Sequence, residues 1–164
     1  ELTHGGGGAY QAYLKAAVTP FIESRFRADP EARVLLGHSY GGLLGAQILF
    51  TDPTMFQAYV LGSPSFWFGR RHIMTMEADY AKAHADLPAE VFMYIGDFET
   101  PGPTPRHATR YDMVGDMAAM EQVLKSRAYP SLSVRSTVLA DEDHLTVAPS
   151  GFTRALMAVL PAGP

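Results

Sequence analysis

The chain of 164 residues contains no cysteine. This absence excludes disulfide bonds, thiolate catalysis and metal sites built on cysteine. It leaves the compartment open, cytoplasmic or periplasmic, because cytosolic and exported proteins can both lack cysteine. Long apolar runs are missing as well, since none approaches the roughly 18 residues that a membrane-spanning helix needs. We therefore expect no membrane span. We expect no signal region within residues 1–164, which begin at Glu1.

An excess of charge of one sign is also absent. Thirteen lysines and arginines stand against 17 aspartates and glutamates, which gives a formal net charge of −4. The basic residues are scattered and only Arg70 and Arg71 are adjacent, so nothing in the charge predicts nucleic-acid binding. Hydrophobic residues make up 47% of the chain and charged residues 18%, a composition typical of a single globular domain over residues 1–164 with a sizeable core.

Buried-strand patterns and helical apolar stripes alternate along the sequence. Strands are expected over residues 32–36, 58–61, 91–95 and 132–139, and helices over residues 9–27, 43–51, 72–84, 111–127 and 149–160. Pro20 should kink or divide the first helix. The alternation predicts an α/β fold with a mostly parallel sheet and helices on both faces. In open sheets of this kind, ligands bind beyond the carboxyl ends of the strands.

The segment Gly37-His38-Ser39-Tyr40-Gly41-Gly42 follows the first strand and precedes an apolar helix. It fits the Gly-x-Ser-x-Gly nucleophile elbow, in which a strained strand-to-helix turn projects a serine hydroxyl beyond the sheet. We expect Gly37 and Gly41 to be required because a side chain at either position would collide with the neighbouring strand or the start of the helix. The alternative is a glycine-rich turn with a structural role only.

A catalytic serine needs a base, and the base needs an orienting carboxylate. In α/β-hydrolases the order along the chain is serine, acid, histidine. Ser39, a carboxylate after the third strand and His144 after the fourth strand supply this order. Glu99 is the preferred acid, Asp97 the second candidate and Asp112 the third. The alternative for His144 is a solvated loop histidine.

No cofactor or metal ion is expected. The run Asp141-Glu142-Asp143-His144 contains carboxylates and an imidazole, but a single histidine in one acidic run lacks the dispersed ligands of a metal site.

The developing oxyanion needs two donors. The backbone N–H of Tyr40, the residue after the nucleophile, should supply one of them. His4-Gly5-Gly6-Gly7 superficially resembles an oxyanion motif of lipases, but it lies only one helix upstream of the nucleophile strand, and we interpret Gly5–Gly8 as a flexible segment leading into that helix.

Only four strands are expected, and the nucleophile strand comes first among them. An isolated sheet would then keep an open apolar edge. We therefore expect residues 1–164 to be the C-terminal portion of an α/β-hydrolase domain. The N-terminal remainder of the same protein would complete the sheet and supply the second oxyanion donor.

Several motifs together resemble the putative-esterase family of α/β-hydrolases, nearest to its siderophore (enterochelin and salmochelin) trilactone esterase branch. They are Gly5–Gly8 before an aromatic-rich helix, Pro20-Phe21-Ile22-Glu23, the elbow, Ser63-Pro64-Ser65-Phe66-Trp67, Gly96-Asp97-Phe98-Glu99 and Asp143-His144. The resemblance implies a serine hydrolase with Ser39 and His144 as the central pair. Some family members work with a Ser–His dyad, which would leave Glu99 without a catalytic role.

These observations predict a serine carboxylic-ester hydrolase that forms an acyl-enzyme, acts on a siderophore-type ester or another small ester, and uses Ser39, His144, Glu99 and the Tyr40 N–H. The alternatives are an acyltransferase of the same fold and a non-catalytic binding protein that keeps the fold. The residues Trp67, Phe66 and Phe68 are expected either to border the site or to pack a loop against the core. Arg70, Arg71 and Arg106 are interpreted as solvated surface residues or as attractors of an anionic substrate.

Overall fold

The computed structural model describes residues 5–108 and 110–160. Four parallel strands form one sheet in the order β1-β2-β3-β4, so each strand lies beside its neighbour in the sequence. The strands are β1 (Val34–His38), β2 (Ala58–Gly62), β3 (Ala89–Gly96) and β4 (Leu132–Leu139). The predicted α/β class and parallel sheet are confirmed, with strand boundaries that differ by no more than two residues.

The burial of each strand follows from its place in the sheet. All five residues of β2 are buried, and Val91, Met93 and Ile95 of β3 have no exposed surface. Such continuous apolar runs are typical of parallel strands covered on both faces. The outer strand β4 instead exposes Ser133 and Arg135, polar residues that make an edge a poor template for further pairing.

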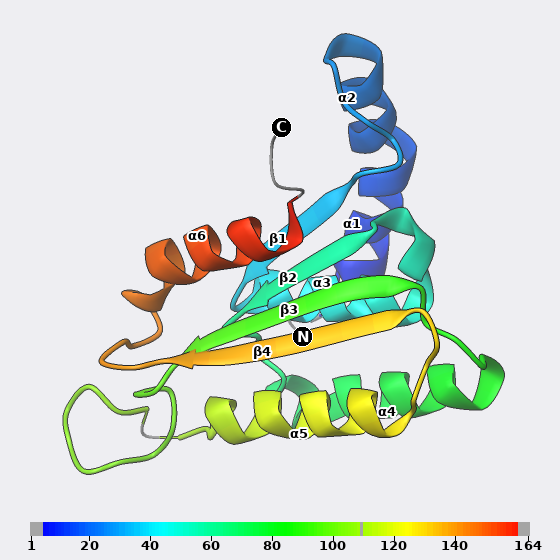
Figure 1. Cartoon of the computed structure of the whole chain (residues 1–164). Coiled ribbons are helices and arrows are strands. Elements are labelled where there is room, and N and C mark those ends of the chain that lie inside the picture. Colours follow the sequence, from blue (N-terminus) through cyan, green and yellow to red (C-terminus); the bar gives the residue numbers. More distant parts are fainter. Residues whose placement is uncertain (1–4, 109, 161–164) are drawn as a thin grey trace.

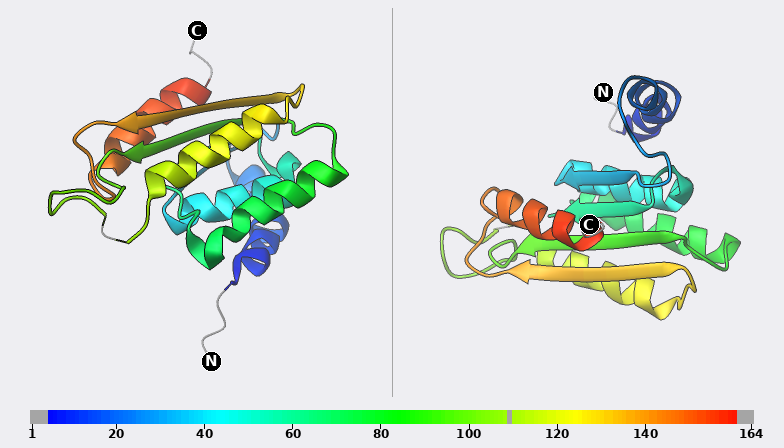
Figure 2. Two further views of the ribbon diagram at one scale, coloured as in Figure 1. Left: turned by 90° about the horizontal axis from the view of Figure 1, so that it is seen from below. Right: turned by 45° about the horizontal axis from the view of Figure 1, so that its top comes forward.

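Helices cover both faces of the sheet. α3 (Tyr40–Thr51), α4 (Phe68–Ala83) and α5 (Met113–Ser126) lie on one side, and α6 (Val147–Val159) lies on the other (Figures 1 and 2). The core is accordingly divided in two. The larger cluster joins α3, α4 and α5 to the sheet, and the smaller one packs Val60, Tyr94 and Leu139 under Val147 and Ala155 of α6.

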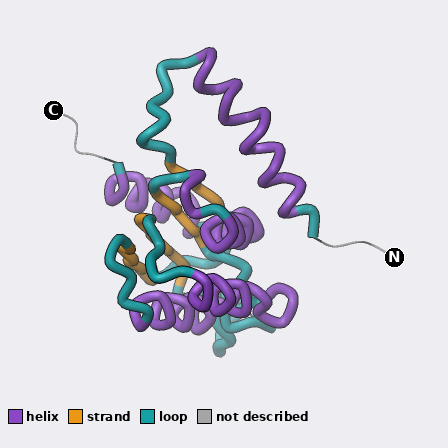
Figure 3. The backbone as a smooth tube through the Cα atoms, turned by 90° about the vertical axis from the view of Figure 1, so that its right-hand side faces the viewer, coloured by secondary structure: helices purple, strands orange, loops and turns teal. Residues whose placement is uncertain are grey.

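The first helical segment stands apart from the sheet. It runs through α1 (Gly7–Tyr13), a π-helical turn (Leu14–Val18) and α2 (Thr19–Arg25), and Figure 3 shows it extending away from the strands. Pro20 lies in the first turn of α2, directly after the π-helical turn, so the irregularity predicted for Pro20 is found there. Gly7 and Gly8 belong to α1, which corrects the expectation of a flexible lead-in over Gly5–Gly8. His4 lies outside the described residues.

The apolar stripe predicted for this segment is largely uncovered. Tyr13, Phe21 and Phe26 are each more than half exposed, and none of the helix residues is buried. The strand next to it in sequence, β1, pairs with β2 only, and the described residues place no strand against its outer edge. The expected open edge beside the nucleophile strand is therefore present in this part of the chain.

α4 contains an unusual first turn. Gly69, Arg70 and Arg71 have φ values of 59°, 58° and 63°, the left-handed region, and right-handed helix begins only at His72. The helix predicted over residues 72–84 corresponds to that regular part. Among the described residues no helix is both long and apolar enough to span a bilayer.

Candidate active site

Ser39 stands on a strained bend between β1 and α3. Its backbone adopts φ 59° and ψ −120°, a combination that costs roughly 1–3 kcal/mol for a non-glycine residue. Hydrogen bonds to the neighbouring segment hold the bend: the Ser39 N–H donates to the Gly62 carbonyl over 2.8 Å, and the Ser39 carbonyl accepts from the Ser65 N–H over 3.2 Å. The loop after β2 therefore fixes the serine in the elbow conformation.

The two glycines of the elbow are not equivalent. A Cβ added at Gly37 would lie 2.3 Å from the Gly41 carbonyl oxygen, so no side chain fits there without movement of the backbone. A Cβ at Gly41 would meet nothing within 4 Å. The expectation that both positions exclude a side chain holds for Gly37 and is wrong for Gly41, because α3 leaves the sheet with open space around its second residue.

His144 connects the serine to a buried carboxylate. Its Nε2 lies 3.0 Å from Ser39 Oγ, and its Nδ1 lies 2.6 Å from Glu99 Oε2. A carboxylate only accepts hydrogen bonds, so Nδ1–H is the donor and Nε2 is left free to accept the serine proton. The hydrogen bond that His144 donates to Glu99, together with the negative charge of Glu99, raises the pKa of His144 above its usual 6.5 despite partial burial.

Glu99 is held by two further donors. Its side chain is 2% exposed, and its Oε1 accepts the Ser63 hydroxyl over 2.6 Å and the Gly96 backbone N–H over 2.9 Å. The turn after β3, in which the Glu99 N–H donates to the Gly96 carbonyl, directs the carboxylate back toward the strand end. Together with the Nδ1–H of His144, these contacts fix both oxygens of the carboxylate.

The other acid candidates lie elsewhere. Asp97 accepts the backbone N–H of Glu142 over 3.2 Å, and Asp112 accepts the N–H of Gly115 as the N-cap of α5. Of the three carboxylates proposed from the sequence, the structure brings only Glu99 to His144. The residues meet because β1, β3 and β4 are parallel and end at the same edge of the sheet (Figure 1), and Ser39, Glu99 and His144 follow these strands in the sequence.

His38 supports the loop that carries His144, a contact that sequence reasoning did not identify. Its Nε2 donates to the His144 carbonyl over 2.9 Å, and the two imidazole rings lie 4.8 Å apart. Burial lowers the pKa of His38, which favours the neutral ring. The only indication of this role in the sequence is that His38 lies inside the elbow motif. Its hydrogen-bond partner, the His144 carbonyl, is 106 residues away and cannot be inferred from the sequence.

Arg106 binds the loop that carries His144 from its solvent-exposed side. Its guanidinium donates to the Asp141 carboxylate over 2.7 Å, to the Asp141 carbonyl over 2.9 Å and to Asp143 over 3.3 Å, and it also lies over the ring of Phe98. Asp143 accepts in addition the N–H groups of Leu145 and Thr146 ahead of α6. Arg106 is a surface residue, as expected, with 42% of its side chain exposed, and these contacts also tie it to the loop that carries His144.

The segment after β2 lies against the elbow. Ser65 Oγ is 3.4 Å from Ser39 Oγ. Phe66 is fully buried in the core, whereas Trp67 stacks on Tyr111 at 3.9 Å and also approaches the half-exposed ring of Tyr40. The two expectations for these aromatic residues are therefore both met, by different members of the segment. The backbone N–H of Tyr40 is at the first position of α3, where no intrahelical acceptor exists.

This geometry can be compared with known proteins. A family model described as "Putative esterase" matches residues 3–132. The chain belongs to this esterase family. The match includes the elbow and Glu99, and it ends before the loop that carries His144.

The relatives of this esterase-family chain include named siderophore esterases. The ferri-bacillibactin esterase BesA of Bacillus subtilis is 26% identical over 164 residues, which are 98% of this chain and 54% of BesA. The siderophore enterobactin esterase of Emericella nidulans is 39% identical over 74 residues, 44% of this chain and 24% of that protein. The chain thus spans about half the length of BesA and less of the fungal enzyme.

Solved structures show the same fold. An IroE-like serine hydrolase from Shewanella oneidensis superposes with a TM-score of 0.80 at 26% identity, covering 94% of this chain and 48% of that protein. The siderophore hydrolase EstB from Aspergillus nidulans gives 0.81 at 25% identity, covering 98% and 61%. The predicted resemblance to the siderophore esterase branch is confirmed.

Proposed function

We propose that this chain carries the nucleophile, base and acid of a serine esterase. The observation that supports this function most directly is the continuous hydrogen-bonded series from Ser39 Oγ through His144 to the buried Glu99. The 3.0 Å contact lies within the range in which a proton can pass from a nucleophile to its base, and the 2.6 Å contact is a hydrogen bond through which the acid can orient that base.

The proposed reaction has two halves. Ser39 Oγ attacks the ester carbonyl carbon while His144 Nε2 takes the hydroxyl proton, and the Tyr40 N–H stabilises the oxyanion. Collapse of the tetrahedral intermediate breaks the bond to the alkoxy group, which leaves as the alcohol with the proton from His144. Water then attacks the acyl-enzyme through the same base, releasing the carboxylic acid and restoring Ser39.

Glu99 orients the imidazole and stabilises its charged form during both halves. Ser63 and the Gly96 N–H hold the carboxylate, and His38 and Arg106 hold the loop of the base. Under this proposal these four groups position the catalytic residues and do not touch the substrate.

The substrate we propose is a small ester of siderophore type. Its support is the similarity to BesA and to the fungal siderophore esterases, whose names specify siderophore esters. Hydrolysis would add one water for each ester bond cleaved, which opens a cyclic ester to a linear product.

The N-terminal remainder of the same protein is the proposed intramolecular partner. The open edge of β1, the exposed rings of the first helical segment and the coverage of about half of BesA support this proposal. The remainder would pair with β1, cover these rings and provide the second oxyanion donor.

The test is turnover of p-nitrophenyl acetate by the full-length protein and its Ser39→Ala variant. Loss of the nucleophile should lower kcat by about 10⁶-fold, as in a serine protease. A fluorophosphonate probe should label the parent protein at Ser39 and leave the variant unlabelled. Unchanged turnover in Ser39→Ala would rule out the mechanism, and absence of both labelling and turnover in the parent would favour a non-catalytic binding protein.

Product analysis in the presence of a competing alcohol separates hydrolysis from acyl transfer. An esterase releases mainly the free acid under these conditions. A new ester as the main product would assign the chain to the acyltransferase alternative.

A further inference from the structure

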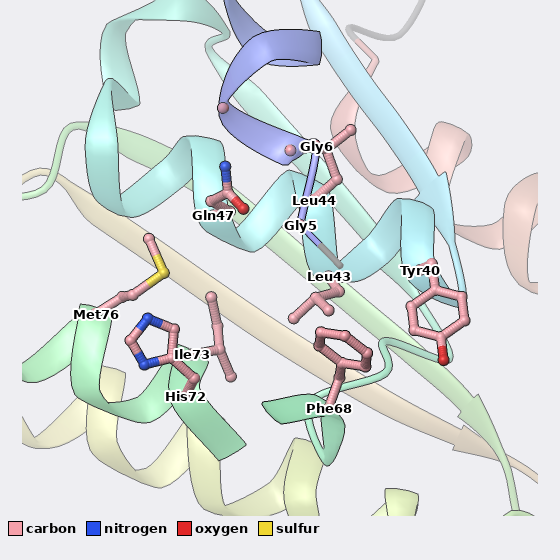
Figure 4. A pocket seen from close by; sticks show the side chains of 12 residues that line it. Gly5, Gly6, Tyr40, Leu43, Leu44, Gln47, Phe68, His72, Ile73 and Met76 are labelled. Carbon is pink, nitrogen blue, oxygen red and sulfur yellow. The ribbon is translucent and has the colours of Figure 1, made fainter. Parts of the chain in front are cut away.

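An apolar groove starts beside the nucleophile and runs between α3 and α4. It has a volume of about 630 Å³ and is roofed by Gly5–Gly8 (Figure 4). The walls are formed by Leu43, Leu44 and Gln47 of α3 and by Phe68, Ile73 and Met76 of α4. Tyr40, the residue that follows Ser39 in the elbow, lines one end of the groove.

The groove follows the axis of α3. Tyr40, Leu43, Leu44 and Gln47 have the spacing i, i+3, i+4 and i+7, which places them on one helix face. Seven residues of α-helix rise about 10 Å. In Figure 4 Tyr40 and Phe68 lie at one end of the groove and Gln47 and Met76 at the other. The groove therefore leads away from the reacting serine over the length of a medium alkyl chain.

The lining selects for apolar, uncharged groups. It contains no lysine, arginine, aspartate or glutamate among the described residues, and its polar side chains are the Tyr40 hydroxyl, Gln47 and His72. The roof has no side chains because it consists of glycine. A Cβ at Gly7 would lie 2.5 Å from Gln47 Oε1, so the glycine lets α1 approach α3 closely at this point. An extended aliphatic chain matches this lining, whereas an ionic group would lose its water without gaining a partner.

We propose that this groove is a subsite for an unbranched aliphatic chain of about six to eight carbons in the ester, a specificity that rests on the proposed esterase function. The chain would enter past Tyr40 while its ester carbonyl stays at Ser39. It belongs to either the acyl or the alkoxy half of the substrate, and the same apolar contacts would hold both.

The first experiment needs no variant. The full-length protein is assayed with p-nitrophenyl esters from acetate to dodecanoate, and separately with alkyl acetates from methyl to dodecyl. Each buried methylene is expected to raise kcat/KM by up to about fourfold. In one of the two series, kcat/KM for the eight-carbon chain (the octyl ester below) should therefore exceed kcat/KM for the two-carbon chain by at least about tenfold. A rise in the first series places the acyl chain in the groove, and a rise in the second places the alkoxy chain there.

The second experiment obstructs the groove. His72 lines it and has an exposed side chain, so His72→Trp should fill part of the space without disturbing the core. Thr75 is exposed on the same helix and does not line the groove, which makes Thr75→Trp the matched control. His72→Trp should abolish the preference for the octyl ester over the acetate, while Thr75→Trp keeps the parent profile.

Three results would overturn the inference, and they are distinguishable from one another. Ser39-dependent hydrolysis of acetate with no preference for longer chains in either series would reject the subsite and leave the esterase function standing. Retention of the octyl preference in a folded His72→Trp protein would place the chain elsewhere. A protein that hydrolyses none of these esters would refute the proposed function and this specificity with it.

Discussion

Replacing Glu99 by glutamine tests whether the buried carboxylate contributes to catalysis or whether Ser39 and His144 suffice. Glutamine has nearly the same shape, so the turn after β3 can keep its path. The backbone N–H of Gly96 donates to Oε1 over 2.9 Å and can only donate. The amide oxygen of glutamine must therefore occupy this position, and its NH₂ group must face His144 Nδ1.

This orientation puts the imidazole in the wrong tautomer. A donor facing Nδ1 requires that nitrogen to accept, which moves the proton of neutral His144 to Nε2. Nε2 then has no lone pair for the Ser39 proton. In a serine protease the equivalent loss of the carboxylate lowers kcat by about 10⁴-fold, which corresponds to about 5.4 kcal/mol of transition-state stabilisation. We expect a decrease of that order in Glu99→Gln.

The assay is steady-state hydrolysis of p-nitrophenyl acetate at pH 8, with circular dichroism to verify folding. Asp97→Asn is the matched control, because it makes the same carboxylate-to-amide change in the same turn and the Asp97 side chain accepts a backbone N–H of the histidine loop instead of facing the imidazole. It should keep activity near that of the parent. A folded Glu99→Gln protein with kcat within about tenfold of the parent, in the same assay that detects the Ser39→Ala loss, would refute the reasoning and favour a dyad.

Three other outcomes follow from the geometry. His144 must be neutral to act as the base, and Glu99 raises its pKa, so kcat/KM should rise with pH through a midpoint above 6.5. The Glu99→Gln variant should have a lower midpoint than the parent. A pH-rate profile of the parent with a midpoint below 6.5 would contradict this prediction. Gly37→Ala should lower the free energy of unfolding by about 1–3 kcal/mol or more, whereas Gly41→Ala should cause no loss of stability. Urea unfolding measures both values. Equal effects of the two substitutions would contradict the close contact described between position 37 and the Gly41 carbonyl. Arg106→Gln removes exposed ion pairs worth roughly 0–1 kcal/mol each, so the melting temperature should change little. We expect kcat to fall about two- to fivefold because the loop that carries His144 is held less firmly. An unchanged kcat would show that this loop keeps its position without Arg106.

The sequence predicts the parts of this site that depend on local order. Val34-Leu35-Leu36 and the glycines around Ser39 specify a strand, a tight bend and a helix within a dozen residues, and the alternation of elements specifies a parallel sheet. Parallel strands align their carboxyl ends, so the serine, the acid and the histidine had to reach one edge. This reasoning needs only chain direction and periodicity.

The contacts that select among neighbouring residues are tertiary and could not be predicted. Asp97 and Glu99 differ by two positions in one turn, and only the turn's hydrogen bond to Gly96 decides which carboxylate faces inward. The Ser63 hydroxyl that holds Glu99 comes from 36 residues upstream, and Arg106 reaches Asp141 from a proline-rich loop. No periodicity in the sequence encodes such pairs.

The contacts that hold Ser39, Glu99 and His144 bear on the proposed partnership with the N-terminal remainder. The elbow is held by the Gly62 carbonyl and the Ser65 N–H, both on the β2 side, and the acid and base come from segments after β3 and β4. Each contact described for the three residues therefore lies on the inner side of β1. The described residues place no strand on the outer edge of β1, so under the proposed partnership this edge would be available for strand pairing and for the second oxyanion donor. Under the proposed function, the described residues would carry out proton transfer and supply one oxyanion donor, and the remainder would complete the stabilisation of the tetrahedral intermediate.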